Sequence, residues 1–424
     1  MNADKIVDRI RTDAVSFNSM EDLDVIMEAI GDAKIVLLGE ASHGTSEFYT
    51  MRAELSKRLI LQKGFDFIAV EGDWPSCNSV NQYIKGASGA AESAELALSD
   101  FNRWPTWMWA NREVADFVNW LRTANQTFTK EKQIGFYGLD MYSLWESMEH
   151  IIAYLEKTGS SQLEHAKKAF ECFEPFNRDE QSYGISAGLF GEGCEDEVVQ
   201  LLFEMNKKRH QHPGSEAALD AEMNTLVALN AEKYYRTMVM GGPESWNVRD
   251  QHMVEVLKRT LNFHGQDAKA IVWEHNTHIG DARATDMAGD GMVNVGQLIR
   301  EDPEYKQVFA LGFGTYQGQV LAGRAWGSPV EVMDVPKAIN GSWEDCMHQA
   351  GQGENQLLLF NKSQLEFQEV IGHRAIGVVY DPNRELGNYV PSRMAQRYDA
   401  YIHLDETTAL RPLILESVNS ELLV

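Results

Sequence analysis

The stretch "KIVLLGEASHGTSEFYTMRAEL", residues 34–55, joins a short apolar run, a polar turn and a helix-like pattern. The apolar run lacks polar alternation, which predicts a strand buried on both faces of a sheet. Thr45 or Ser46 can cap the helix that follows. Its apolar positions share one face: Phe48, Met51, Leu55 and Leu59. The stretch therefore places an acid, Glu40, and an imidazole, His43, where a buried strand ends and a helix begins.

Other apolar runs have the same character: 65–72, 133–140, 269–276, 307–314, 355–361, 375–382 and 400–406. Strands of this kind are covered on both faces, so they predict a largely parallel sheet between helix layers. Between residues 143 and 261 the pattern is helical throughout. We therefore expect an α/β fold with three α/β/α layers, whose body (1–142 and 262–424) is interrupted by a helical subdomain (143–261).

The charge balance restricts the classes of partner. Of 424 residues, 38 are Lys or Arg and 63 are Asp or Glu, which gives a net charge of −25. Such a charge repels phosphate backbones and anionic membrane surfaces, so we expect neither nucleic acid nor membrane as a partner. No stretch has the length and apolarity of a membrane span, and residues 1–17 lack the apolar core of a secretion signal.

The cysteines are scattered and show no ligand-like spacing: Cys77, Cys172, Cys194 and Cys346. This pattern predicts neither a disulfide framework nor a zinc site, and it favours a reducing, cytoplasmic location.

Polar side chains recur where the predicted strands end: Glu40 and His43, Glu71 and Asp73, Asp140, and Glu274, His275 and His278. Any one of these carboxylates is more often a helix cap or a turn former. However, ligands of parallel α/β sheets bind beyond the carboxyl ends of the strands, so the coincidence indicates a site. Arg52 lies about two turns into the first helix, and its side chain leans back towards His43. An exposed surface charge is the alternative for Arg52.

His275 and His278 can also lie on one helical face and bind a metal, with Glu40 or Glu71 as a further ligand. A second ligand cluster is missing from the sequence, so acid–base or hydrogen-bonding roles are favoured. The segment "GISAG", 184–188, matches the nucleophile-elbow pattern, but polar residues precede it instead of a buried strand. We therefore do not expect Ser186 to be a nucleophile.

The segment "FNRWPTWMWANRE", residues 101–113, holds three tryptophans within six positions. Core packing is the simpler interpretation for one or two of them. Stacked on a ligand, they suit a large molecule with much apolar surface. We expect Trp104 and Trp107, together with Trp74, to contact substrate.

Five motifs together resemble the erythromycin esterase family: "GEASHGTSEFYTMRAEL", "IAVEGDWP", "EHNTHIGDAR", "WNVRDQHM" and "GNYVPSRMAQRYDA". The resemblance runs along nearly the whole chain. It implies a three-layer α/β/α body and hydrolysis of macrolactone esters without a metal or other cofactor, while some relatives carry the label of succinoglycan biosynthesis. The family's site residues correspond to Glu40, His43, Arg52, Glu71, His275 and His278. Asp140 and Arg249 complete the predicted substrate contacts.

These observations predict a hydrolase of small-molecule carboxylic esters or lactones, with His43 as the base that activates water. Glu71 or Glu40 would orient His43. Arg52, His275 and His278 would stabilise the oxyanion or protonate the leaving alkoxide. Two alternatives stay open: a metal-dependent hydrolase, and a non-catalytic protein that binds a sugar, a cofactor or a haem-like ligand. The natural substrate and the oligomeric state are left open.

Overall fold

The computed structural model describes residues 3–19, 21–176, 178–191, 193–208, 215–361 and 363–413. Within these ranges one sheet of nine strands forms the centre, in the order β1-β8-β11-β6-β2-β5-β3-β4, with β7 paired to β6. The strand bounds are β1 Val15–Ser16, β2 Ile35–Leu38, β3 Phe67–Asp73, β4 Gly135–Asp140, β5 Ala270–Trp273, β6 Val308–Gly323, β7 Val330–Val335, β8 Gln356–Leu359 and β11 Ala400–Thr407. A separate antiparallel pair consists of β9 Ile371–Arg374 and β10 Tyr389–Ser392.

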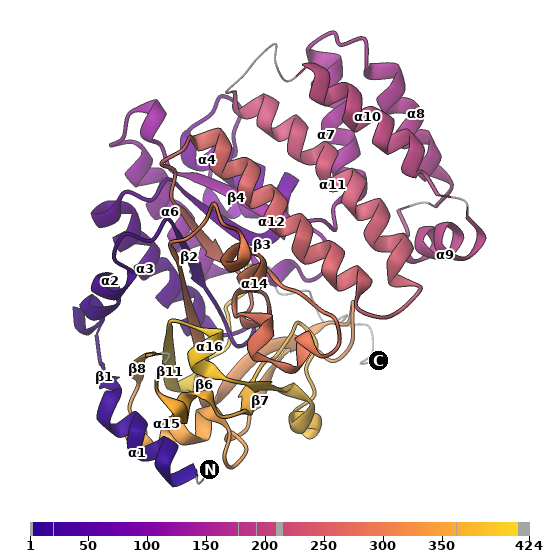
Figure 1. Cartoon of the computed structure of the whole chain (residues 1–424). Coiled ribbons are helices and arrows are strands. Elements are labelled where there is room, and N and C mark those ends of the chain that lie inside the picture. Colours follow the sequence, from indigo (N-terminus) through magenta and orange to yellow (C-terminus); the bar gives the residue numbers. More distant parts are fainter. Residues whose placement is uncertain are drawn as a thin grey trace, which may run out of the picture.

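The sheet is largely parallel, as the apolar runs predicted. Strands β11, β6, β2, β5, β3 and β4 are parallel to one another. Strand β8 is antiparallel to both of its neighbours, β11 and the edge strand β1, and the hairpin partner β7 is antiparallel to β6. Strand β5 follows β4 in sequence by more than a hundred residues, yet it lies between β2 and β3 in the sheet (Figure 1).

Helices cover both faces of the sheet (Figure 1). Their bounds are α1 Ala3–Asp13, α2 Asp24–Ile30, α3 Ser46–Lys63, α4 Trp74–Lys85, α5 Ala94–Leu98, α6 Arg112–Asn125, α7 Leu144–Lys157, α8 Leu163–Phe173, α9 Glu180–Phe190, α10 Glu195–Lys208, α11 Glu216–Met238, α12 Glu244–His264, α13 Asn276–Ile279, α14 Val295–Glu301, α15 Trp343–Gly351 and α16 Met394–Arg397. Side chains alternate along each strand, so each strand contributes to two cores. One core contains α2, α3 and α6, and the other contains α1, α12, α14 and α15. The fold class is three-layer α/β.

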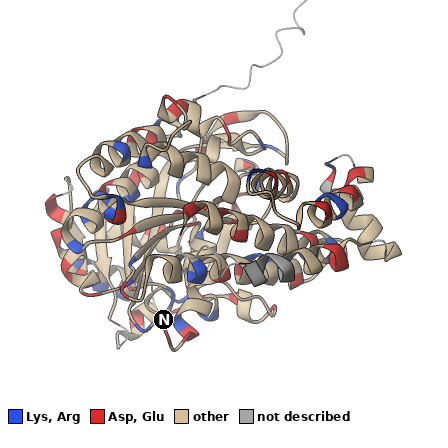
Figure 2. Ribbon diagram, turned by 90° about the horizontal axis from the view of Figure 1, so that it is seen from above, with Lys and Arg blue, Asp and Glu red and all other residues tan. Residues whose placement is uncertain are grey.

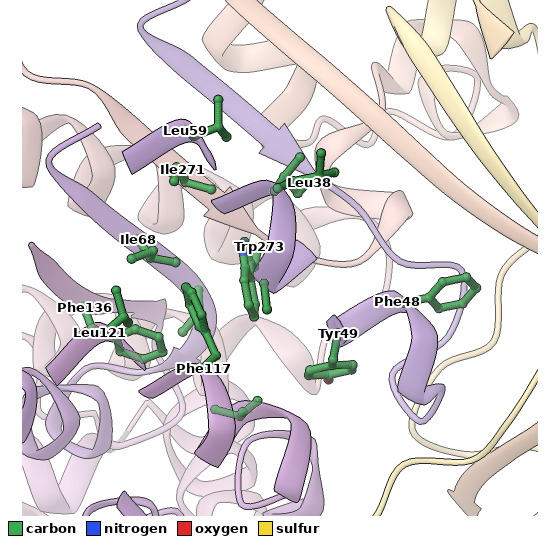
Figure 3. Close-up of a cluster of buried hydrophobic side chains, with 14 of the residues drawn as sticks. Leu38, Phe48, Tyr49, Leu59, Ile68, Phe117, Leu121, Phe136, Ile271 and Trp273 are labelled. Carbon is green, nitrogen blue, oxygen red and sulfur yellow. The ribbon is translucent and has the colours of Figure 1, made fainter. Parts of the chain in front are cut away.

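Figure 3 shows the first of these cores. Strand residues Leu38, Ile68, Phe136, Ile271 and Trp273 meet helix residues Phe48, Tyr49, Leu59, Phe117 and Leu121 there. The ring of Trp273 stacks on Phe117, with the centroids 5.0 Å apart. This packing fixes α3 against the sheet, and with α3 the loop that carries His43.

The described chain between β4 and β5 is helical, and α7 to α11 stand to one side of the sheet (Figure 1). Residues of α7, α8, α9, α10 and α11 share a core of their own. Helices α11 and α12 also contribute to the core against the sheet, through residues such as Leu226 and Met253. Because one helix serves both cores, the limits 143–261 of a helical subdomain stay a prediction.

Ser186 lies inside α9, and no strand immediately precedes this helix among the described residues, so the structure does not form a nucleophile elbow there. The glycines of this motif serve helix packing instead. A Cβ atom at Gly184 would lie 2.6 Å from the Tyr235 carbonyl oxygen, and one at Gly188 would lie 2.8 Å from that of Arg236. These glycines let α9 approach the backbone of α11.

The expectation about the cysteines was wrong for one pair. Cys172 in α8 and Cys194, directly before α10, form a disulfide with a Cα–Cα distance of 6.0 Å. The two residues are 22 positions apart in sequence, and only the return of the chain along α9 brings them together. Cys77 and Cys346 are buried free thiols.

Reduction of this disulfide should lower the free energy of unfolding by about 2–4 kcal/mol, because it releases a closed loop in the unfolded chain. Urea unfolding with and without a thiol reductant measures the loss. The Cys172→Ala variant is the matched control, and its unfolding should be insensitive to reductant. Identical curves for the oxidised and reduced wild type would contradict the prediction.

The run 375–382 is not a strand of the sheet, contrary to expectation. It forms isolated bridges instead, Ile376 to Ser42 and Val379 to Gly323. Ile376 and Tyr380 are buried against β6 and β7, which accounts for the apolar pattern. The segment therefore lies near the carboxyl end of β2, and Ile376 donates its N–H to the Ala41 carbonyl at 2.8 Å.

In the view of Figure 2, Asp and Glu positions are spread over many helices, with Lys and Arg positions among them. Among the described helices, none has both the length and the apolarity needed to cross a membrane.

Candidate active site

The carboxyl ends of four adjacent strands carry the predicted site residues. In spatial order, β2 is followed by Glu40 and His43, β5 by His275 and His278, β3 contains Glu71, and β4 ends at Asp140. All of these side chains are buried or nearly so. The sheet order therefore brings together residues that are up to 238 positions apart in the chain, from Glu40 to His278.

The first half of the site is the chain Arg52–Glu40–His43. His43 Nδ1 lies 3.0 Å from Glu40 Oε1, and Arg52 Nη2 donates to Glu40 Oε2 at 2.6 Å. Glu40, and not Glu71, is thus the carboxylate that holds His43. With Nδ1 bonded to Glu40, Nε2 is the nitrogen left for the cavity that His43 lines.

The structure corrects the expected place of Arg52. The side chain is fully buried and lies over the rings of Tyr49 and Trp273, at 4.4 and 4.9 Å from their centroids. It does not line the cavity. Its position in the second turn of α3 and the packing of that helix direct the guanidinium under Glu40, so Arg52 acts on the site through Glu40.

The second half is organised by Arg249 of α12. Its Nη2 donates to Glu71 Oε1 and to Asp140 Oδ2, both at 2.7 Å, and its Nε donates to Asp140 Oδ1 at 3.0 Å. Glu71 Oε2 accepts the backbone N–H of His275 at 2.8 Å. Burial alone raises the pKa of Glu71, yet the charges of His278 and Arg249 hold it well below its usual range. Glu71 is therefore ionised at neutral pH.

Carboxylates on two sides of His278 favour its protonated form. Its Nδ1 lies 3.0 Å from both oxygens of Asp250, and its Nε2 lies 3.4 Å from Glu71 Oε1. Burial alone lowers the pKa of His278, but Asp250 and then Glu71 raise it to about 10. The indole of Trp246 stacks on the ring at 4.6 Å between centroids. Asp250 was not among the predicted site residues, although it follows Arg249 directly in "WNVRDQHM".

Two further groups are neutral. Burial, and then the neighbouring charge of His43, lower the pKa of His275 well below its usual range. Its ring lies 4.8 Å from that of His43, and its Nε2 has no hydrogen-bond partner among the described residues. Burial raises the pKa of Glu274 well above its usual range, which leaves a protonated acid behind the site. His275 thus offers an uncharged imidazole beside His43.

A cavity of about 610 Å³ opens over these residues. His43, Glu71, Asp140 and Arg249 line it, and Trp104 adds an aromatic surface. Its volume lies within the range of sites for small organic ligands. Further lining residues that the sequence analysis did not identify are Phe101, Arg103, Trp109, Tyr142, Tyr234, Tyr235 and Trp326. Tyr142 follows the end of β4 by two residues and could have been found there, whereas the others come from loops and from α11 and carry no strand-end signal.

Two predicted substrate contacts are core residues instead. Trp74 is buried, stacks on Tyr137 and donates its Nε1–H to Asp220 at 2.8 Å. Trp107 is also buried and does not line the cavity. A tryptophan in a helix or tight turn can point either into the core or into the cavity. The sequence does not distinguish these two orientations.

A metal site on His275 and His278 does not fit the donor set. Both nitrogens of His278 are engaged, one by Asp250 and the other beside Glu71, and Arg249 Nη1 lies 3.1 Å from His278 Nε2. A guanidinium in this position repels a metal cation. In the described part of the chain, no group of three or more His, Cys, Asp or Glu side chains has an arrangement suited to a metal ion.

The charge on His278 predicts a pH dependence of stability. Its folded pKa of about 10 exceeds the value of ~6.5 for an unfolded chain, so the stabilisation is complete below pH ~6.5. It is lost as the pH rises through about 10. The free energy of unfolding should therefore fall by the order of a few kcal/mol between pH 6.5 and 10.

Chemical denaturation at a series of pH values measures this fall. The His278→Gln variant should show a flatter profile over the same window. The exposed His165→Gln variant serves as the control and should follow the wild type. A His278→Gln profile as steep as that of the wild type would exclude a raised pKa at this residue.

The model of the erythromycin esterase family matches residues 60–407. The chain belongs to the erythromycin esterase family. The matched range begins after Glu40, His43 and Arg52, so the assignment of these three rests on their geometry. Erythromycin esterase type II of Escherichia coli is 21% identical over 394 residues, which cover 83% of this chain and 87% of that protein.

Solved structures share the fold of this erythromycin esterase family member. A structure described as a succinoglycan biosynthesis protein has a TM-score of 0.78 at 20% identity and covers 96% of this chain and 98% of its own. A variant of an erythromycin esterase in its open conformation has a TM-score of 0.68 at 18% identity, with coverages of 94% and 97%. The family resemblance found in the sequence motifs is confirmed.

Proposed function

We propose that this chain hydrolyses carboxylic esters, macrolactones among them, by direct attack of a water molecule. The observation that carries the proposal is the buried Arg52–Glu40–His43 chain, which presents one imidazole nitrogen to a cavity. Membership of the erythromycin esterase family supports the reaction class. The relative from Escherichia coli is named for erythromycin, and that name is the basis for placing macrolactones in the substrate panel.

In the proposed reaction, His43 Nε2 takes a proton from water as the hydroxide attacks the ester carbonyl. The carboxylate of Glu40 accepts the Nδ1–H and stabilises the imidazolium that forms. Arg249 lines the cavity and, together with the charge of His278 behind it, stabilises the oxyanion. The imidazolium of His43 then gives its proton to the leaving alkoxide. Protons and charges balance without a covalent acyl-enzyme.

The test is hydrolysis of a panel of macrolides and aryl esters by metal-stripped protein in ¹⁸O-water, followed by mass spectrometry. The proposal expects one ¹⁸O atom in the carboxylate product of a single turnover and no acylated protein. Acyl-enzyme accumulation would contradict direct attack of water. Turnover that returns only after a divalent metal is added would favour the metal-dependent alternative, and ligand binding without turnover would favour a binding protein.

A further inference from the structure

One wall of the cavity combines an indole pair with a carboxylate, and the proposed reaction uses neither. Trp326, in the turn between β6 and β7, is 66% exposed. Its ring meets that of Trp104 edge-on, at 4.6 Å between centroids. Trp104 is fixed in turn by a bond from its Nε1–H to the Ser328 carbonyl at 3.1 Å. This anchored pair gives the cavity a rigid aromatic surface.

Asp73 lines the same cavity and has an unused acceptor. Its Oδ2 accepts a hydrogen bond from Arg103 Nη2, whereas its Oδ1 has no partner among the described residues. Asp73 follows Glu71 by two positions on β3. Because Asp73, Glu71 and His43 line the same cavity, the residue with the free acceptor borders the space that an ester at His43 would fill.

These features exclude several ligand classes. A plain hydrocarbon chain would leave Asp73 Oδ1 buried and unpaired, which is costly. An anionic ligand would meet four lining carboxylates against two arginines: Glu71, Asp73, Asp140 and Asp179, with Arg103 and Arg249. The excess of carboxylates tolerates a cation elsewhere in the cavity, but at Asp73 itself an ammonium group gains little, because Arg103 already pairs with that carboxylate. A neutral hydroxyl donor on a framework with apolar C–H faces fits both the acceptor and the indoles.

We propose that the ester cleaved at His43 is carried on a sugar or a comparable polyol, whose C–H face packs on Trp104 and Trp326 and whose hydroxyl donates to Asp73. The inference rests on the proposed function, since it names the substrate class of the same site. It makes Asp73 the residue that distinguishes a polyol ester from an alkyl ester of equal size.

The test compares two acetates that share the acyl group and the ring size, monoacetylated methyl glucoside and cyclohexyl acetate. In wild type the ratio of kcat/KM should favour the sugar ester. In Asp73→Asn, Arg103 holds the amide oxygen, so the amide NH₂ replaces Oδ1 and the substrate hydroxyl loses its charged acceptor. The ratio should therefore fall by about 10-fold.

The Trp326→Ala variant should raise KM for the sugar ester by about 10-fold with a smaller change in kcat. Leu61→Ala, which removes an exposed apolar side chain on α3, is the surface control. A kcat/KM ratio that is the same in Asp73→Asn and wild type would overturn the inference while leaving the esterase proposal standing.

Calorimetric binding of the sugar ester is measured in parallel, with the inactive His43→Ala protein and with the same protein carrying Asp73→Asn. If no ester is turned over by wild type, binding that weakens at least 10-fold with Asp73→Asn supports the sugar site and rejects the esterase. Equal binding by both proteins, or binding by neither, overturns the sugar site whatever the outcome for turnover.

Discussion

The His43→Ala variant is expected to lose ester hydrolysis by a factor of about 10²–10⁴ in kcat while keeping its fold. His43 lines the cavity, and its ring is anchored through one hydrogen bond to Glu40. Glu40 keeps its ion pair with Arg52 when the imidazole is removed, so no carboxylate is left without a partner. Steady-state kinetics, with circular dichroism as the check on folding, measure the effect.

The matched control is His165→Ala, which removes an exposed histidine of α8. It should retain wild-type kcat. Turnover by His43→Ala within a few-fold of wild type would remove His43 from the role of base. The neutral imidazole of His275, 4.8 Å away between ring centroids, would then be the next group to replace.

The Arg52→Met variant is expected to lose about 3–5 kcal/mol of the free energy of unfolding. Both Arg52 and Glu40 are buried, at 0% and 1% exposure of their side chains. Removal of the guanidinium leaves the Glu40 carboxylate in the core with His43 as its remaining partner. Methionine has a similar length and keeps most of the contacts with Tyr49 and Trp273. The loss in free energy of unfolding therefore measures the effect of removing the positive charge.

Equilibrium urea unfolding of the Arg52→Met/Glu40→Gln double variant provides the control. Because glutamine removes the orphaned charge, the double variant should recover part of the lost stability. The pair is not coupled if Glu40→Gln lowers the free energy of unfolding of Arg52→Met by as much as it lowers that of the wild type. Lys57→Met, on the same helix but partly exposed, should be close to neutral.

Much of the fold follows from local pattern. The runs 34–40, 65–72, 133–140 and 269–276 coincide with β2, β3, β4 and β5, because a strand covered on both faces needs an unbroken apolar sequence. The run 375–382 misled for the same reason, since a loop that is buried against β6 and β7 near the carboxyl end of β2 is equally apolar. Periodicity reports burial and does not identify the neighbour that provides it.

The site residues could be located by their strand ends, but their pairing could not. Sequence alone left open which glutamate holds His43, and the answer depends on Arg52 reaching Glu40 from α3. The contribution of Asp250 depends on α12 lying beside α13, which is a tertiary relation. The disulfide was likewise missed, because Cys172 and Cys194 meet only through the return of the chain along α9, and Trp326 was missed because its partner Trp104 is more than 200 residues away.

The insertion of β5 between β2 and β3 has a consequence for the order in which a growing chain acquires structure. Until residue 270 leaves the ribosome, β2 has no strand to pair with, because its neighbours β5 and β6 both come later, and Glu40 stays apart from the β3–β4 pair that carries Glu71. The helical segment that precedes β5 must be synthesised before β5 can enter the sheet. We therefore expect this protein to assemble its centre late in translation, with the middle strand closing the sheet and the site in the same step.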